Sequence, residues 1–160
     1  MKEVKVEINK ILTPIDFSDY SKKAFEYAVE FAEHFNASIT LVYVVEPQIY
    51  PADFTMGQVA IPNIDSNLTE AAEKELLSLI DSNDFDKTRI DYKIRIGQPF
   101  HEIIETAAEF DVDLIIIATH GHTGVEHLLF GSTAEKVVRK APCPVLTLRQ
   151  PIKGFHYKNV

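Results

Sequence analysis

The chain has 160 residues, of which 46% are hydrophobic and 25% are charged, with a formal net charge of −8 and one cysteine. This length and composition predict one globular domain that buries roughly 70% of the surface of its unfolded chain. The negative charge, with no long basic run, argues against binding to nucleic acid, and the single cysteine excludes an intrachain disulfide.

The first part of the chain predicts a strand, a helix and a second strand. Residues 11–15 form a short apolar run, and residues 19–35 predict a helix with Ser18 or Asp19 as its N-cap. Residues 39–45 are apolar and rich in β-branched side chains, as in a strand that is covered on both faces. The positions assigned to the core face of the helix are Ala24, Tyr27, Ala28, Phe31, Ala32 and Phe35.

The middle of the chain predicts a long loop, a second helix and a third strand. Residues 46–65 contain several prolines, and their apolar residues show no helical or strand periodicity. This predicts a loop long enough to have a function. Residues 89–96 alternate apolar and charged side chains, which predicts a strand near the edge of the sheet. The apolar positions that mark the second helix are Leu68, Ala72, Leu76 and Ile80.

The last part of the chain predicts two more helices and two more strands. The turn Gly97-Gln98-Pro99 leads into a third helix, and residues 114–118 form a buried fourth strand. Residues 132–140 form a fourth helix, and residues 144–148 form a last strand at the sheet edge. The core face of the third helix is assigned to Ile103, Ile104, Ala107 and Ala108. Strands that alternate with helices predict an α/β fold with a parallel sheet that is covered on both faces.

The glycine-rich connection between the fourth strand and the fourth helix indicates a binding site. Gly121, Gly124 and Gly131 lie between the buried strand and the helix start, where a backbone can approach an anion and free amides can bind it. Ligands of parallel sheets bind at the carboxyl ends of the strands, and Asp16 follows the first strand. The pattern matches neither a Walker A motif nor a dinucleotide fingerprint. Two interpretations stay open. The connection is either a phosphate-binding loop or merely a tight link between strand and helix, and in the second case Asp16 and Ser132 only cap the helices that follow them.

Several motifs together resemble those of the universal stress protein family. The spacing Ala118-x2-Gly121-x9-Gly131-Ser132 is similar to the family's nucleotide motif Gly-x2-Gly-x9-Gly-Ser/Thr. The opening segment 11–18, the turn 97–99 and the closing segment 141–146 are also similar to the family's motifs, in order, over residues 9–149. The resemblance implies a single Rossmann-like domain of the adenine nucleotide alpha hydrolase-like type in residues 1–150, with a five-stranded sheet of order 3-2-1-4-5 and a C-terminal tail, residues 151–160.

The resemblance also implies an adenine nucleotide, ATP or AMP, whose phosphates are bridged by Mg²⁺. By matching position, the adenosine would be held by Pro14, Asp16 and Val44, the ribose side would be lined by Ile117 and Ala118, and the phosphates would be bound by Gly121, Gly131, Ser132 and Thr133. Ala118 stands where the family motif has glycine. Its methyl would weaken binding if the backbone there needed a positive φ, and would matter little in ordinary strand geometry.

The function that the resemblance implies is that of a nucleotide-binding sensor or regulator of the stress response, with an unknown protein partner. An exposed last strand, 145–148, favours a homodimer that pairs through it. The two alternatives are a dimer with an empty site that works by protein contacts, and a slow ATPase or phosphotransferase. No lysine or arginine lies in the glycine loop, so we expect at most slow hydrolysis and assign no catalytic residue.

A zinc site and a membrane span are not expected. His120, His122 and His127 match no zinc pattern. The charged residues 1–7 and the lack of a long apolar run argue against a signal peptide and a membrane span. We therefore expect a cytoplasmic protein.

Overall fold

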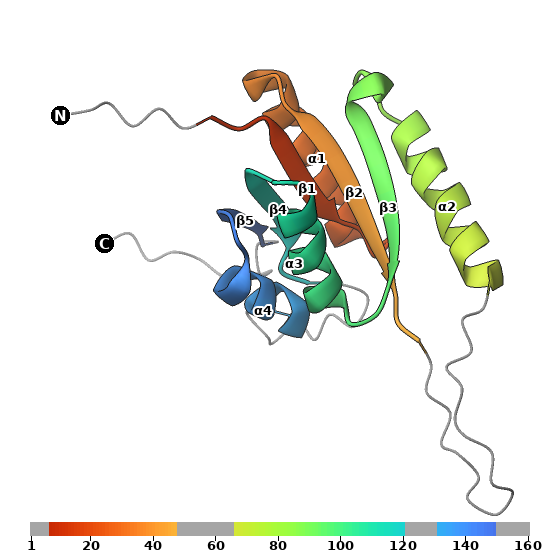
Figure 1. Cartoon of the computed structure of the whole chain (residues 1–160). Coiled ribbons are helices and arrows are strands. Elements are labelled where there is room, and N and C mark those ends of the chain that lie inside the picture. Colours follow the sequence, from red (N-terminus) through yellow and green to blue (C-terminus); the bar gives the residue numbers. More distant parts are fainter. Residues whose placement is uncertain (1–6, 48–65, 121–130, 150–160) are drawn as a thin grey trace, which may run out of the picture.

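The structure, a computed structural model that describes residues 7–47, 66–120 and 131–149, has a five-stranded parallel sheet as its central layer (Figure 1). The strands are β1 (Lys10–Pro14), β2 (Ser38–Val45), β3 (Ile90–Ile96), β4 (Leu114–Ala118) and β5 (Val145–Leu148). The helices are α1 (Asp19–Phe35), α2 (Ser66–Asp81), α3 (Pro99–Glu109) and α4 (Ser132–Lys140), with a short 3₁₀ turn η1 (Lys87–Arg89). The strand order β3-β2-β1-β4-β5 confirms the predicted α/β fold, with β3 and β5 at the edges.

Side chains of each strand alternate between two apolar layers, because helices cover both faces of the sheet. On one face, Ile11 and Ile39 pack with side chains of α1 and α2. On the other face, Leu12, Val42 and Ile117 pack with side chains of α3 and α4. In Figure 1, α3 and α4 lie in front of the sheet and α1 lies behind it. No helix of the described residues combines the length and the apolar character needed to cross a bilayer.

The N-cap of α1 is Ser18, whose side chain accepts a hydrogen bond from the Ser21 N–H at 3.2 Å. The core face predicted for this helix is wrong in part. Tyr27 and Phe35 are 44% and 37% exposed, whereas Phe25, which was not assigned to the core, is 2% exposed. The small side chains of Ala24, Ala28 and Ala32 bring the helix close to the sheet, and the buried stripe centres on them.

The predicted core positions of α2 and α3 also need correction. Leu68 is 50% exposed at the start of α2. In α3, Ala108 is exposed and Ile104 is half-buried, whereas Thr106 is buried. The Thr106 Oγ1 donates a hydrogen bond to the Glu102 carbonyl at 2.6 Å, so burial leaves its hydroxyl satisfied. An apolar pattern overlooks this kind of core residue.

Candidate functional site

A pocket of about 360 Å³ opens at the carboxyl edge of the sheet, above β1, β2 and β4. The chain leaves β1 toward β2 on one side and leaves β4 toward β5 on the other, so the connections diverge there and leave a crevice. All the predicted site residues within the described part of the chain line this pocket. They are Pro14, Asp16, Val44, Ile117, Ala118, Gly131, Ser132 and Thr133. Gly121, Gly124, His122, His127 and the segments 48–65 and 150–160 lie outside the described residues.

The inner wall of the pocket is apolar. Val42, Val44 and Ile117 contribute to it from β2 and β4, and Ile103 of α3 and Ala134 of α4 close it from the helices. Such a surface, with a few polar groups at its rim, suits the flat face of an aromatic ring.

Asp16 lies in a tight turn between β1 and α1. Its Oδ1 accepts hydrogen bonds from the Ser18 N–H at 3.0 Å and from the Ser18 Oγ at 2.5 Å. Phe17, between them, has a left-handed φ of 63°, and its ring packs 4.9 Å from the ring of Tyr43. The α1 cap itself is supplied by Ser18, and Asp16 holds that cap in place. The turn thereby fixes a carboxylate at the pocket, at a cost in backbone strain of about 1–3 kcal/mol.

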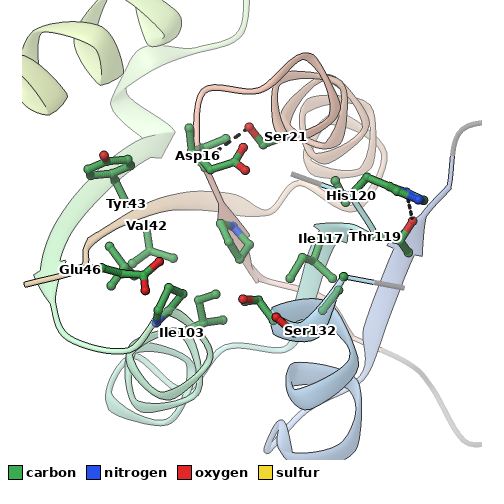
Figure 2. Close-up of a pocket in the computed structure, with 18 residues that line it drawn as sticks. Asp16, Ser21, Val42, Tyr43, Glu46, Ile103, Ile117, Thr119, His120 and Ser132 are labelled. Carbon is green, nitrogen blue, oxygen red and sulfur yellow. Dashed lines mark hydrogen bonds between the residues drawn. The ribbon is translucent and has the colours of Figure 1, made fainter. Parts of the chain in front are cut away.

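The start of α4 lies across the pocket from Asp16 (Figure 2). Gly131 is the N-cap, so the capping role considered for Ser132 is wrong. The Gly131 N–H donates to the Thr119 carbonyl at 2.6 Å, which corrects the expectation that this amide faces the ligand. The first intrahelical bond runs from the Glu135 N–H to the Gly131 carbonyl. The N–H groups of Ser132 and Thr133 lie before this first bond, so the helix has no carbonyl four residues earlier that could accept from them.

Ala118 has ordinary strand geometry. It is the last residue of β4 and is aligned with Leu148 of β5. The described residues that have a positive φ do not include Ala118. Its side chain packs against the apolar layer under α1 rather than against α3 and α4. Of the two possibilities raised by the missing motif glycine, the structure therefore has the one in which the methyl costs little.

Several lining residues were not predicted. Glu46 follows β2, and its carboxylate faces the pocket in Figure 2. Tyr43 lies beside it, and burial raises the pKa of the Tyr43 hydroxyl, with smaller contributions from the carboxylates of Glu75, Asp16 and Glu46. Glu46 could have been found from sequence, because it directly follows a buried strand next to β1. Acidic groups therefore gather at the β1–β2 side of the pocket, and helix amides at the α4 side.

Another lining residue, His120, follows β4 directly. Its Nδ1 lies 3.0 Å from the Thr119 Oγ1, and its ring packs 5.6 Å from that of Tyr20. These contacts hold the imidazole at the rim of the pocket on the α1 side.

Comparison with known proteins gives a consistent result. The family model of the Universal stress protein family matches residues 7–149. A universal stress protein of Methanocaldococcus jannaschii is 33% identical over 144 residues, which cover 90% of this chain and 84% of that protein.

Two similar solved structures contain nucleotides. A universal stress protein in complex with cAMP has a TM-score of 0.64 at 22% identity, covering 88% of this chain and 97% of that chain. A universal stress protein from Archaeoglobus fulgidus in complex with dAMP has a TM-score of 0.61 at 20% identity, covering 89% and 98%. At these identities the likeness shows a shared fold.

Proposed function

The chain belongs to the universal stress protein family, and we propose that it binds an adenine nucleotide, ATP or AMP, in the pocket at the carboxyl edge of the sheet. The observation that carries this proposal is the arrangement of the pocket, which joins an apolar wall to carboxylates on one side and a helix N-terminus on the other. The nucleotides bound by the cAMP and dAMP complexes of fold relatives support the same ligand class.

The nucleoside occupies the β1–β2 side of the pocket in this proposal. Val44 and Ile117 offer apolar surface to the base and ribose. Asp16 and Glu46 provide oxygen atoms that can accept hydrogen bonds from an amino group or from ribose hydroxyls. Their negative charges disfavour a phosphate at this side, so they also fix the direction in which the nucleotide lies.

The phosphates bind at the start of α4. The amides and hydroxyls of Ser132 and Thr133 line the pocket there, and the positive end of the helix dipole favours an anion. Gly121 joins this set by its position in the motif. Hydroxyl and phosphate oxygens are ligands that Mg²⁺ prefers, so Ser132 and Thr133 fit a bridging Mg²⁺, which would neutralise phosphate charge.

We also propose that the protein is a cytoplasmic homodimer that pairs through β5 and reports nucleotide state as a stress sensor or regulator. β5 is an edge strand with half-buried side chains. The carbonyls of Pro144 and Leu148 accept hydrogen bonds from the N–H of Ile115 in β4 and from the N–H of Thr119 just after β4. Because these groups alternate along a strand, the N–H and C=O of Val145 and Thr147 point to the open edge, where a partner strand can pair. Nucleotide state would reach a partner protein through the segment 46–65, which begins at the pocket residue Glu46.

Native mass spectrometry and thermal unfolding test the binding proposal. The purified protein should carry an adenine nucleotide, or should be stabilised by ATP with Mg²⁺ by about 2.7 kcal/mol at 100 times the dissociation constant. A protein that carries no nucleotide, and whose melting is unchanged by ATP and AMP, would instead be a dimer with an empty site.

A further inference from the structure

Two lysines of α4 lie against one aromatic ring beside the pocket. The Nζ atoms of Lys136 and Lys140 are 4.7 Å and 5.5 Å from the ring centroid of Phe100. Phe100 directly follows Pro99, which lines the pocket, and it packs against the apolar layer under α3 and α4. Two ammonium groups at one ring repel each other, so the ring holds each of them weakly.

Lys136 is placed to reach the start of its own helix. It lies four residues after Ser132 and three after Thr133, and these spacings put all three on one side of α4. Its Cα is about 6 Å beyond that of Ser132 along the helix axis. Side chains in a helix lean toward the N-terminus, so a change of rotamer carries the ammonium to the first turn. Lys140 lies a further turn away.

Within the described part of the chain, the pocket lining offers no lysine or arginine to a highly charged ligand. Among the described residues that line it, Asp16 and Glu46 are acidic and none is lysine or arginine. The amides at the start of α4 can serve one phosphate. A nucleoside triphosphate brings two more phosphoryl groups, and these amides together with one Mg²⁺ balance only part of the added negative charge.

We infer that Lys136 exchanges the Phe100 ring for the outer phosphates of a bound nucleotide, and thereby makes the site prefer ATP to AMP. Lys140 stays on the ring and keeps it covered. This inference rests on the proposed function, because it assigns a selectivity to that same site. It requires that Lys136 strengthen the binding of ATP and contribute little to the binding of AMP.

Calorimetric titration of the Lys136→Met protein with ATP and with AMP, both with excess Mg²⁺, tests the inference. Methionine keeps the unbranched apolar stem on Phe100 and removes the charge. The ATP dissociation constant should rise about tenfold, the value of one charge-assisted hydrogen bond, while that of AMP changes less than about twofold. The ATP affinity of the variant should also depend less on salt than that of the wild type.

Lys140→Met is the matched control, with the same change on the same ring one turn farther from the pocket. It should leave the ATP to AMP affinity ratio within about twofold of wild type, because its ammonium stays too far from the phosphates. The inference is overturned if Lys136→Met keeps the wild-type ratio, if it weakens both nucleotides equally, or if Lys140→Met has the same effect. A wild-type protein that binds neither nucleotide would remove the proposed function itself, whereas unchanged binding by Lys136→Met would remove only this inference.

Discussion

The substitution Gly131→Ala adds one methyl at a position where the backbone of Thr119 lies unusually close. The new Cβ would lie 3.0 Å from the Thr119 carbonyl oxygen, whereas ordinary contacts begin near 3.4 Å. That oxygen is a backbone atom, and it also accepts the Gly131 N–H at 2.6 Å. The φ of Gly131, −67°, is ordinary for any residue. Glycine is therefore favoured by the close approach of Thr119, just after β4, and the backbone must move by a few tenths of an ångström to admit alanine.

This shift should cost both stability and affinity. Overpacking of this kind costs about 1–3 kcal/mol of unfolding free energy, which lowers the melting temperature by several degrees. Moving the amides of Ser132 and Thr133 away from a phosphate should weaken AMP binding at least about tenfold, the value of one hydrogen bond to a charged group. Gly131→Val, which is larger, should abolish binding while the protein stays folded.

Thermal unfolding and calorimetric titration with AMP measure these two effects separately. Ser132→Ala is the control, because it removes an exposed hydroxyl and keeps the backbone amide. Its stability should stay close to wild type, and its affinity should fall less than that of Gly131→Ala. Wild-type AMP affinity in Gly131→Ala would refute the assignment of the phosphates to this helix start.

Three further predictions concern β4, β5 and Cys143, which lies just before β5. Ala118→Gly should keep nucleotide affinity within about twofold and lower stability by about 1 kcal/mol, since the methyl packs against the apolar layer under α1; a clear loss of affinity in titration would contradict this. Thr147→Pro removes an N–H at the open edge without breaking the β4–β5 ladder, so sedimentation should show folded monomers, and an intact dimer would place the interface elsewhere. Burial raises the pKa of the Cys143 thiol above its ordinary 9.0. The thiol should react slowly with iodoacetamide at pH 8, and stability should fall as the pH rises past 9.0, because the unfolded thiol ionises first; fast labelling of the folded protein, or stability that stays constant through this range, would count against a protected thiol.

The fold could be predicted because its strongest signals are local. Residues 19–35, 114–118 and 132–140 were assigned from periodicity and apolar runs, and α1, β4 and α4 have the same bounds. The side chains at the margin of the core could not be assigned this way. Phe25 and Tyr27 differ by two positions on one helix, and only the close approach of the alanines to the sheet decides which is buried.

The candidate site could be predicted in outline and not in its contacts. The glycine spacing and the ends of the first and fourth strands indicated that Asp16 and Ser132 belong to one site, and both line the same pocket. Glu46 could have been predicted, because it directly follows a buried strand, whereas Lys136 carries no local signal, because its significance depends on what lies beside its helix. The pairing of the Gly131 N–H with Thr119 is likewise a tertiary contact, and the glycine motif alone does not reveal it.

The most direct test of the nucleotide site is an NMR titration of ¹⁵N-labelled protein with AMP and, as a matched ligand without phosphate, with adenosine. The amide resonances of Ser132 and Thr133 should shift strongly with AMP and little with adenosine, while that of Val44 shifts with both. AMP that binds and leaves the Ser132 and Thr133 amides unmoved would contradict the account.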